Sequence, residues 1–125
     1  MNTQTTPTSS RTRLRAAWAA ELDAARTARS TGDTRAEWMH LERAHILSQP
    51  MAGPHLFTHQ RMFGASWRRR DGREVAGQLF RLVLAVPGTL SGRYPVGNTG
   101  GADVSAFKPM PIADDLAALL EEAPR

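Results

Sequence analysis

Apolar residues recur at helical spacing in four segments of the chain, with polar residues between them. A repeat of three or four residues places apolar side chains on one face of a helix, whereas strict alternation would indicate a strand. The pattern therefore predicts helices over about 10–29, 34–48, 54–70 and 74–86. Their apolar positions include Leu14, Trp18, Leu22, Trp38, Leu41, Met62, Trp67, Val75, Leu79, Leu82 and Val83.

Short turns separate these predicted helices. Turn-forming or helix-ending residues stand at Gly32-Asp33, Pro50, Asp71-Gly72 and Pro87-Gly88. Asp33 is a suitable N-cap for the second helix, because a carboxylate accepts the N–H groups left unpaired at a helix start. Helices joined by short connections pack as antiparallel neighbours, so the four helices are predicted to form two hairpins that resemble tetratricopeptide units.

Residues 91–111 interrupt the helical pattern with glycine and proline, which are incompatible with a regular helix or a central strand. Apolar residues such as Val96 and Val104 predict that this segment wraps against the helices. A last helix is predicted from Ile112 to about Glu122. The fold class is therefore all-α: a compact bundle of two repeat-like hairpins plus a C-terminal helix. We expect one domain over 10–125 after a disordered tail of residues 1–9.

Composition limits the functions that this fold can carry. Cysteine is absent, which excludes disulfides, thiolate metal sites and cysteine nucleophiles. No apolar run approaches the ~18 residues of a membrane span, and residues 1–9 contain no signal-peptide core. We therefore expect a cytoplasmic protein with no membrane partner. The sequence contains no nucleophile-elbow motif of the kind that would indicate a serine hydrolase.

The chain has a formal net charge of +4, and all of its 16 Lys and Arg residues except Lys108 are arginine. Such a balance is compatible with anion or nucleic-acid contacts. However, the run Arg68-Arg69-Arg70 also suits a helix C-terminus, where cations complement the helix dipole. Without a recognisable binding motif, nucleic-acid binding ranks last among the functions considered.

All four histidines lie within residues 37–60. His55 and His59 are four residues apart, so they share one helix face. Glu42 and His45 are three residues apart on the preceding helix and form the Glu-x-x-His element of carboxylate metal sites in helical bundles. A short turn brings the two helix ends together. The sequence therefore predicts a transition-metal site of Glu42, His45, His55 and His59.

Two further residues are weaker metal candidates. His40 lies roughly 140° around the helix from His45, so it is a candidate to support a ligand or to hold a second metal. Asp103 is a distant candidate from residues 91–111. Imidazole and carboxylate ligands without sulfur suit Zn(II), Fe(II), Cu(II), Ni(II) or Mn(II). A heme held by one histidine is an alternative cofactor. Its pocket would use Met39, Phe57, Met62 and Trp67, which are also interpretable as core.

The histidines also have structural interpretations. His45 lies near the apolar face and is interpretable as a core histidine bonded to a carbonyl, while Glu42 and Arg43 are interpretable as a solvated ion pair. If a metal is bound with one coordination position open, we expect a small metalloenzyme, an oxidase or a hydrolase acting on a small-molecule substrate. The alternative is a non-catalytic, tetratricopeptide-like interaction module with incidental histidines. A homo-oligomer is compatible with either.

Several stretches carry a family resemblance: HLERAHILSQ, the downstream GPH and TH, WRRRDGRE, and GRYPVGNTGGADVSAFKPMPIADDL. They resemble a small uncharacterised bacterial family, the domain of unknown function 3703, over about residues 14–120. The resemblance implies a family histidine pattern matched here by His40, His45, His55 and His59. It also implies an association of some members with metal-resistance genes, and that residues 91–111 belong to the site. It implies no established activity.

Overall fold

The computed structural model describes residues 7–91, 96–105 and 108–122. These ranges contain α-helices and no strand. The helices are α1 (Pro7–Ser30), α2 (Thr34–Ser48), α3 (Ala52–Arg68), α4 (Gly72–Leu90) and α5 (Asp114–Glu122). The all-α class predicted from the apolar periodicity is confirmed.

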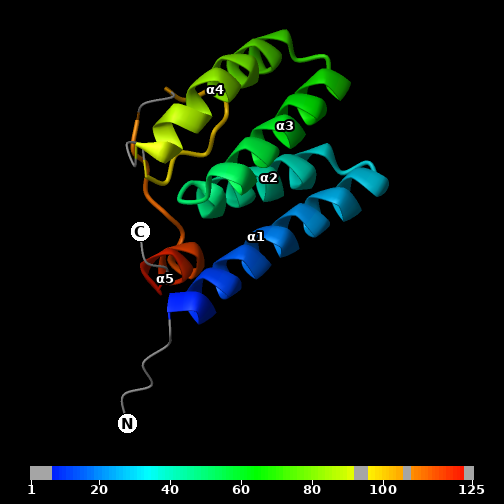
Figure 1. The fold of residues 1–125 in the computed structure, drawn as a ribbon. Coiled ribbons are helices and arrows are strands. Elements are labelled where there is room, and N and C mark those ends of the chain that lie inside the picture. Colours follow the sequence, from blue (N-terminus) through cyan, green and yellow to red (C-terminus); the bar gives the residue numbers. More distant parts are fainter. Residues whose placement is uncertain (1–6, 92–95, 106–107, 123–125) are drawn as a thin grey trace.

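The helices form two antiparallel hairpins (Figure 1). One hairpin consists of α1 and α2 and the other of α3 and α4, and the two meet where α2 packs on α3. The short C-terminal helix α5 packs on α1 and α2. Between α4 and α5, residues 96–105 lie alongside the bundle (Figure 1). None of the described helices is long and apolar enough to cross a membrane.

The predicted turn residues act locally as expected. The Asp33 carboxylate accepts the backbone N–H of Ala36 at 2.9 Å and so caps α2. Gly32 has a φ of +75°, the left-handed conformation that commonly follows a helix end. Before α4, the Asp71 carboxylate accepts the N–H of Glu74 at 3.1 Å. These caps pair backbone N–H groups that the first turns of α2 and α4 would otherwise leave without a helical partner.

Two apolar clusters form the core. The first lies between α1, α2 and α3, and the second between α1, α2 and α5. Trp18 packs against both and donates its indole N–H to Thr58 Oγ1 at 2.9 Å. The first cluster contains Leu22, Ala25, Leu41, Ala44, Met62 and Ala65, and the second Leu14, Ile46, Leu47 and Leu116.

Several helix ends differ from those predicted. Helix α1 begins at Pro7, so residues 7–9 form its first turn; residues 1–6 lie outside the described residues. Helix α3 begins two residues before Pro54, which is tolerated in a first turn because N–H groups there have no helical partner. Helix α4 continues through Pro87 to Leu90. Proline costs a helix one backbone hydrogen bond, and that loss near the end does not stop α4.

The orientation of α4 is the main departure from the expected pattern. Its apolar positions Leu79 and Val83 are 57% and 71% exposed. Its polar residues Glu74, Gln78 and Arg81 are instead buried. The periodicity correctly predicts an amphipathic helix, but the polar face points inward because it makes hydrogen bonds around the histidines described below.

The core assignment predicts a large difference between two leucine truncations. Leu41→Ala should lower the free energy of unfolding by about 2–5 kcal/mol, because Leu41 is fully buried and the cavity cannot collapse completely. The same change at exposed Leu79 should cost less than about 0.5 kcal/mol. Urea unfolding of both variants measures the difference, and equal losses would place Leu79 in the core.

Candidate metal centre

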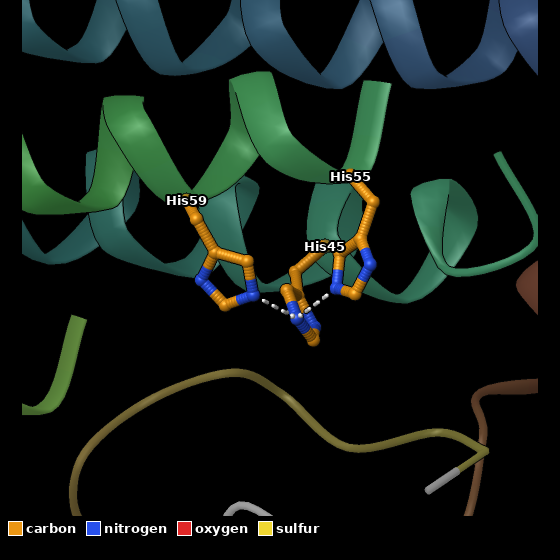
Figure 2. Close-up of side chains that lie close together, drawn as sticks. All are labelled: His45, His55 and His59. Carbon is orange, nitrogen blue, oxygen red and sulfur yellow. Dashed lines mark hydrogen bonds between the residues drawn. The ribbon is translucent and has the colours of Figure 1, made fainter. Parts of the chain in front are cut away.

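Three of the four histidines converge at the junction between the hairpins. His45 lies in the last turn of α2, and His55 and His59 lie in the first two turns of α3. The short turn between α2 and α3 reverses the chain, and the three rings point toward one another (Figure 2). The predicted convergence of these two helix ends is confirmed.

Two of the three pairs of ring nitrogens are spaced like two ligands of one metal ion. His45 Nε2 lies 3.0 Å from His55 Nε2 and 3.1 Å from His59 Nε2, and the three ligand atoms all lie within 4.8 Å of one another. Two nitrogens each bonded to one metal at about 2.0–2.1 Å are roughly 3.0–3.4 Å apart. The three histidines are only 2–5% exposed, so bulk solvent does not surround their rings.

The hydrogen bond to Asn98 fixes the tautomer of His45. Its Nδ1 lies 2.7 Å from the backbone carbonyl oxygen of Asn98, which can only accept. The single N–H of a neutral imidazole must therefore lie on Nδ1. His45 Nε2 is left with its lone pair directed into the cluster, which is the arrangement found in metal-ligating histidines.

Gln78 fixes the tautomer of His59 in the same way. The Gln78 amide nitrogen donates to the Glu74 carboxylate at 2.7 Å and to the carbonyl of Gly100 at 2.6 Å. Both partners are acceptors, so the amide orientation is determined and its oxygen faces His59 Nδ1 at 2.8 Å. His59 therefore carries its proton on Nδ1 and directs the Nε2 lone pair at His45.

The His45–His59 contact is consequently not an ordinary hydrogen bond. Two lone pairs face each other across 3.1 Å, and neither ring has a proton to place between them. His55 can donate to His45, but that leaves the His45–His59 pair unchanged. A cation between the nitrogens would remove the repulsion, so the hydrogen-bond pattern favours an electron-pair acceptor at this point.

Burial of the histidines disfavours a proton as the cation between the two Nε2 atoms. It lowers the pKa of His55 to about 3 and that of His59 to about 4, and the pKa of His45 also falls well below its ordinary value. Burial is the largest cause for each ring, because desolvation penalises the charged form. The positive charge of Arg81 lowers the pKa of His45 and His59 further. At neutral pH the rings are neutral and able to bind metal.

Residues 96–105, the described part of the glycine-rich segment 91–111 that precedes Ala106, form one wall of the site. Gly100 has a φ of +83° and packs so closely on the His45 ring that a Cβ there would lie within 2.7–2.9 Å of ring atoms. The buried Asn98 side chain holds this loop by accepting from the N–H of Gly100 and donating to two backbone carbonyls. The expectation that residues 91–111 pack on the helices is confirmed for the described part of the segment.

A second set of hydrogen bonds connects this wall to α4. Both carboxylate oxygens of Glu74 lie 2.9 Å from the backbone nitrogen of Ala102, which donates to them. A Cβ at Gly77 would collide with the Ala102 side chain at 2.5 Å, so this glycine allows the loop to approach. Arg81 donates to the carbonyl of Val104 at 2.6 Å. Glu74, Gln78 and Arg81 on the polar face of α4 thus each form a hydrogen bond to the backbone of residues 100–104.

The other predicted site residues lie elsewhere. Glu42 is not in the group of converging ligand atoms; it is half-buried, near Glu74 and Asp103, and burial raises its pKa. His40 pairs with Glu21, its Nδ1 lying 2.7 Å from the carboxylate. Arg43 does not pair with Glu42, since it contacts Glu21 and Asp115. Asp103 is exposed and outside the converging group.

The residues considered for a heme pocket do not gather around the histidines. Met62 is fully buried in the first core cluster. Met39, Phe57 and Trp67 are 43–67% exposed. These side chains therefore line no common buried pocket.

Sequence reasoning missed Gln78 and Glu74. Glu74 and Gln78 stand at positions i and i+4 of α4, and a polar pair at that spacing shares one helix face. That spacing was the available signal. Asn98 holds the His45 proton through its backbone carbonyl, which no side-chain pattern identifies.

The lowered pKa values predict a pH-dependent stability for the metal-free protein. The unfolded state binds protons at these histidines below about pH 6.5, whereas His55 and His59 stay neutral in the fold to about pH 4. The contribution of these rings to the free energy of unfolding is therefore fully present above about pH 6.5. It is lost as the pH falls, by at most about 1.4 kcal/mol per pH unit for each ring. Urea unfolding between about pH 7 and 5.5 should show this slope, with a smaller slope in His55→Gln. An identical slope in that variant would contradict the assignment.

Comparison with known proteins identifies a family. A family model described as a protein of unknown function, DUF3703, matches residues 12–120. No curated protein and no solved structure matches the chain. The matched range includes His45, His55, His59 and the residues that orient them, and it confirms the resemblance stated from the sequence. The chain therefore belongs to the DUF3703 family.

Proposed function

We propose that the protein binds one divalent transition-metal ion through the Nε2 atoms of His45, His55 and His59. The fixed pair of opposed lone pairs on His45 and His59 carries this proposal, because a metal ion satisfies both nitrogens at the observed spacing. The Nδ1 hydrogen bonds to Asn98 and Gln78 support it, since such bonds orient metal-ligating imidazoles and raise their basicity.

We further propose that a fourth coordination position is filled by water or by a substrate atom. No other His, Asp or Glu of the described residues belongs to the converging group. Three histidines plus an exchangeable position is the ligand set of catalytic zinc sites, so zinc is the first metal to test. A metal held this way lowers the pKa of bound water, which favours a hydrolytic metalloenzyme over an oxidase.

The alternatives explain the hydrogen bonds less well. A heme needs room for a planar macrocycle at the ligand, whereas His55 and His59 lie within 3.1 Å of His45. A tetratricopeptide-like module with incidental histidines would have no need for buried acceptors that turn two lone pairs together. Metal binding accounts for both the close approach of the three rings and the opposed lone pairs of His45 and His59.

The proposal predicts which substitutions abolish metal binding. Wild-type protein equilibrated with Zn(II) should retain about one equivalent after gel filtration. His45→Ala, His55→Ala and His59→Ala should each retain less than about a tenth, because two imidazoles hold a zinc ion far more weakly than three. Elemental analysis measures the retained metal, and the visible spectrum of the Co(II) form reports its coordination.

Two matched variants limit the ligand set. His40→Ala removes an imidazole outside the cluster, and Glu42→Gln removes the predicted carboxylate ligand while keeping its shape. Both should retain about one equivalent. Loss of metal in Glu42→Gln would make Glu42 the fourth ligand, and full retention in all three cluster variants would eliminate the site.

The role of Gln78 is tested separately. Gln78→Leu removes the acceptor for His59 Nδ1–H without touching a ligand, so binding should stay at one equivalent while affinity falls about 10–100-fold. Competition with a chromogenic chelator measures the affinity. The same change at the exposed Gln60 of α3 is the control and should leave affinity unaltered. Equal affinity in wild type and Gln78→Leu would show that Gln78 does not orient the ring.

A further inference from the structure

Helix α4 has an apolar face that points away from the bundle. At about 100° per residue, Leu79, Phe80 and Val83 lie on the side opposite to the inward residues Glu74 and Gln78. The three apolar side chains are 52–71% exposed. Among the described helices, α4 packs only on α3. We call Leu79, Phe80 and Val83 the outer face of α4.

The hydrogen bonds around the histidines do not explain why the outer face of α4 is apolar. The site requires polar groups on the inward side of α4, and that requirement leaves the outward positions unrestricted. Polar residues would be the ordinary choice on a solvent-facing stripe. Three large apolar residues at one-turn spacing instead form the contact stripe of a helix that pairs with another helix.

The charge around the outer face limits what can cover it. Residues 52–91 contain six arginines and only two acidic residues, an excess equal to the formal net charge of the whole chain. Glu74 and Arg81 are both buried, and Arg68 pairs with Glu37, so the excess positive charge at the surface comes from the other arginines. Arg73 is exposed two turns before Phe80 on the same side, and Arg70 is exposed in the preceding turn. Neither forms an ion pair within the described residues.

This charge disfavours a second copy of the chain as the occupant. Pairing two copies through the outer face would bring two arginine-rich hairpins together, and like charges at an interface are costly. An acidic segment has the complementary charge. A helix with an apolar stripe and glutamates beside it satisfies both the apolar side chains and the arginines.

We propose that the outer face of α4 is a docking surface for an acidic amphipathic helix of a partner protein. The apolar stripe of the partner packs on Leu79, Phe80 and Val83, and its carboxylates approach Arg70 and Arg73. This surface is independent of the metal site, which faces the opposite side of α4.

A designed peptide tests the proposal directly. The probe is a three-heptad helical peptide with leucines on one face and glutamates on the others, carrying a fluorophore for anisotropy. A matched peptide replaces every glutamate with lysine. The full-length protein should bind the glutamate peptide at least about tenfold more tightly than the lysine peptide, and the difference should shrink as salt is added.

Protein variants locate the binding face. Leu79→Ser/Val83→Ser removes apolar contacts from an exposed surface and should weaken binding of the glutamate peptide at least about tenfold. Arg70→Asn/Arg73→Gln should weaken it and reduce its salt dependence. Met39→Ser changes an equally exposed apolar residue on α2 and should leave binding unchanged. Circular dichroism of each variant verifies that the fold is retained.

Four results would overturn the proposal. The first is no saturable binding of the glutamate peptide, and the second is equal binding of the lysine peptide. The third is a dimer in sedimentation that Leu79→Ser/Val83→Ser makes monomeric, because a second copy would then occupy the face. The fourth is binding to vesicles of anionic phosphatidylglycerol that the same double variant abolishes, because the face would then meet a lipid surface.

Discussion

The hydrogen bonds that hold the Nδ1 protons of His45 and His59 direct two Nε2 lone pairs at each other inside the protein. A neutral imidazole has one N–H, so committing it to an outward acceptor leaves nothing to donate inward. The acceptors come from outside the hairpin junction that carries the rings: a backbone carbonyl after α4 and an amide on α4 itself. Much of the remaining architecture serves to place those two acceptors.

A surface helix usually turns its apolar face toward the core, but α4 turns its polar face inward to reach the histidines. Helix α4 turns Glu74, Gln78 and Arg81 inward, where each has a partner at hydrogen-bond distance. The loop that supplies those partners comes close only because Gly77 and Gly100 carry no side chain. Burying polar groups is tolerated when all of them are bonded. Apart from the opposed Nε2 atoms of His45 and His59, every buried side-chain nitrogen and oxygen of the described residues has a hydrogen-bond partner.

The sequence predicts most of the fold and the convergence of three histidines, but not the residues that orient their rings. Periodicity identifies the helices, and the spacing of His55 and His59 with a short turn after His45 is enough to bring three rings together. The same spacing argument includes Glu42, although Glu42 lies outside the converging group, because spacing on one helix defines a face without showing which other residues meet that face. The Gln78–His59 bond joins residues 19 positions apart on different helices. Such a pair depends on how the helices pack, which local patterns do not encode.

The ligands and their supports also differ in how far apart they lie along the chain. The three imidazoles fall within one helix–turn–helix, in which His45 is 10 residues from His55 and 14 residues from His59. The carbonyl that orients His45 is 53 residues away. Closing a short loop costs less chain entropy than closing a long one. Convergence of the three rings on α2 and α3 is therefore a local event that can precede docking of the C-terminal half, whereas Gln78 and Asn98, which hold the Nδ1 protons, join the rings only when that half docks.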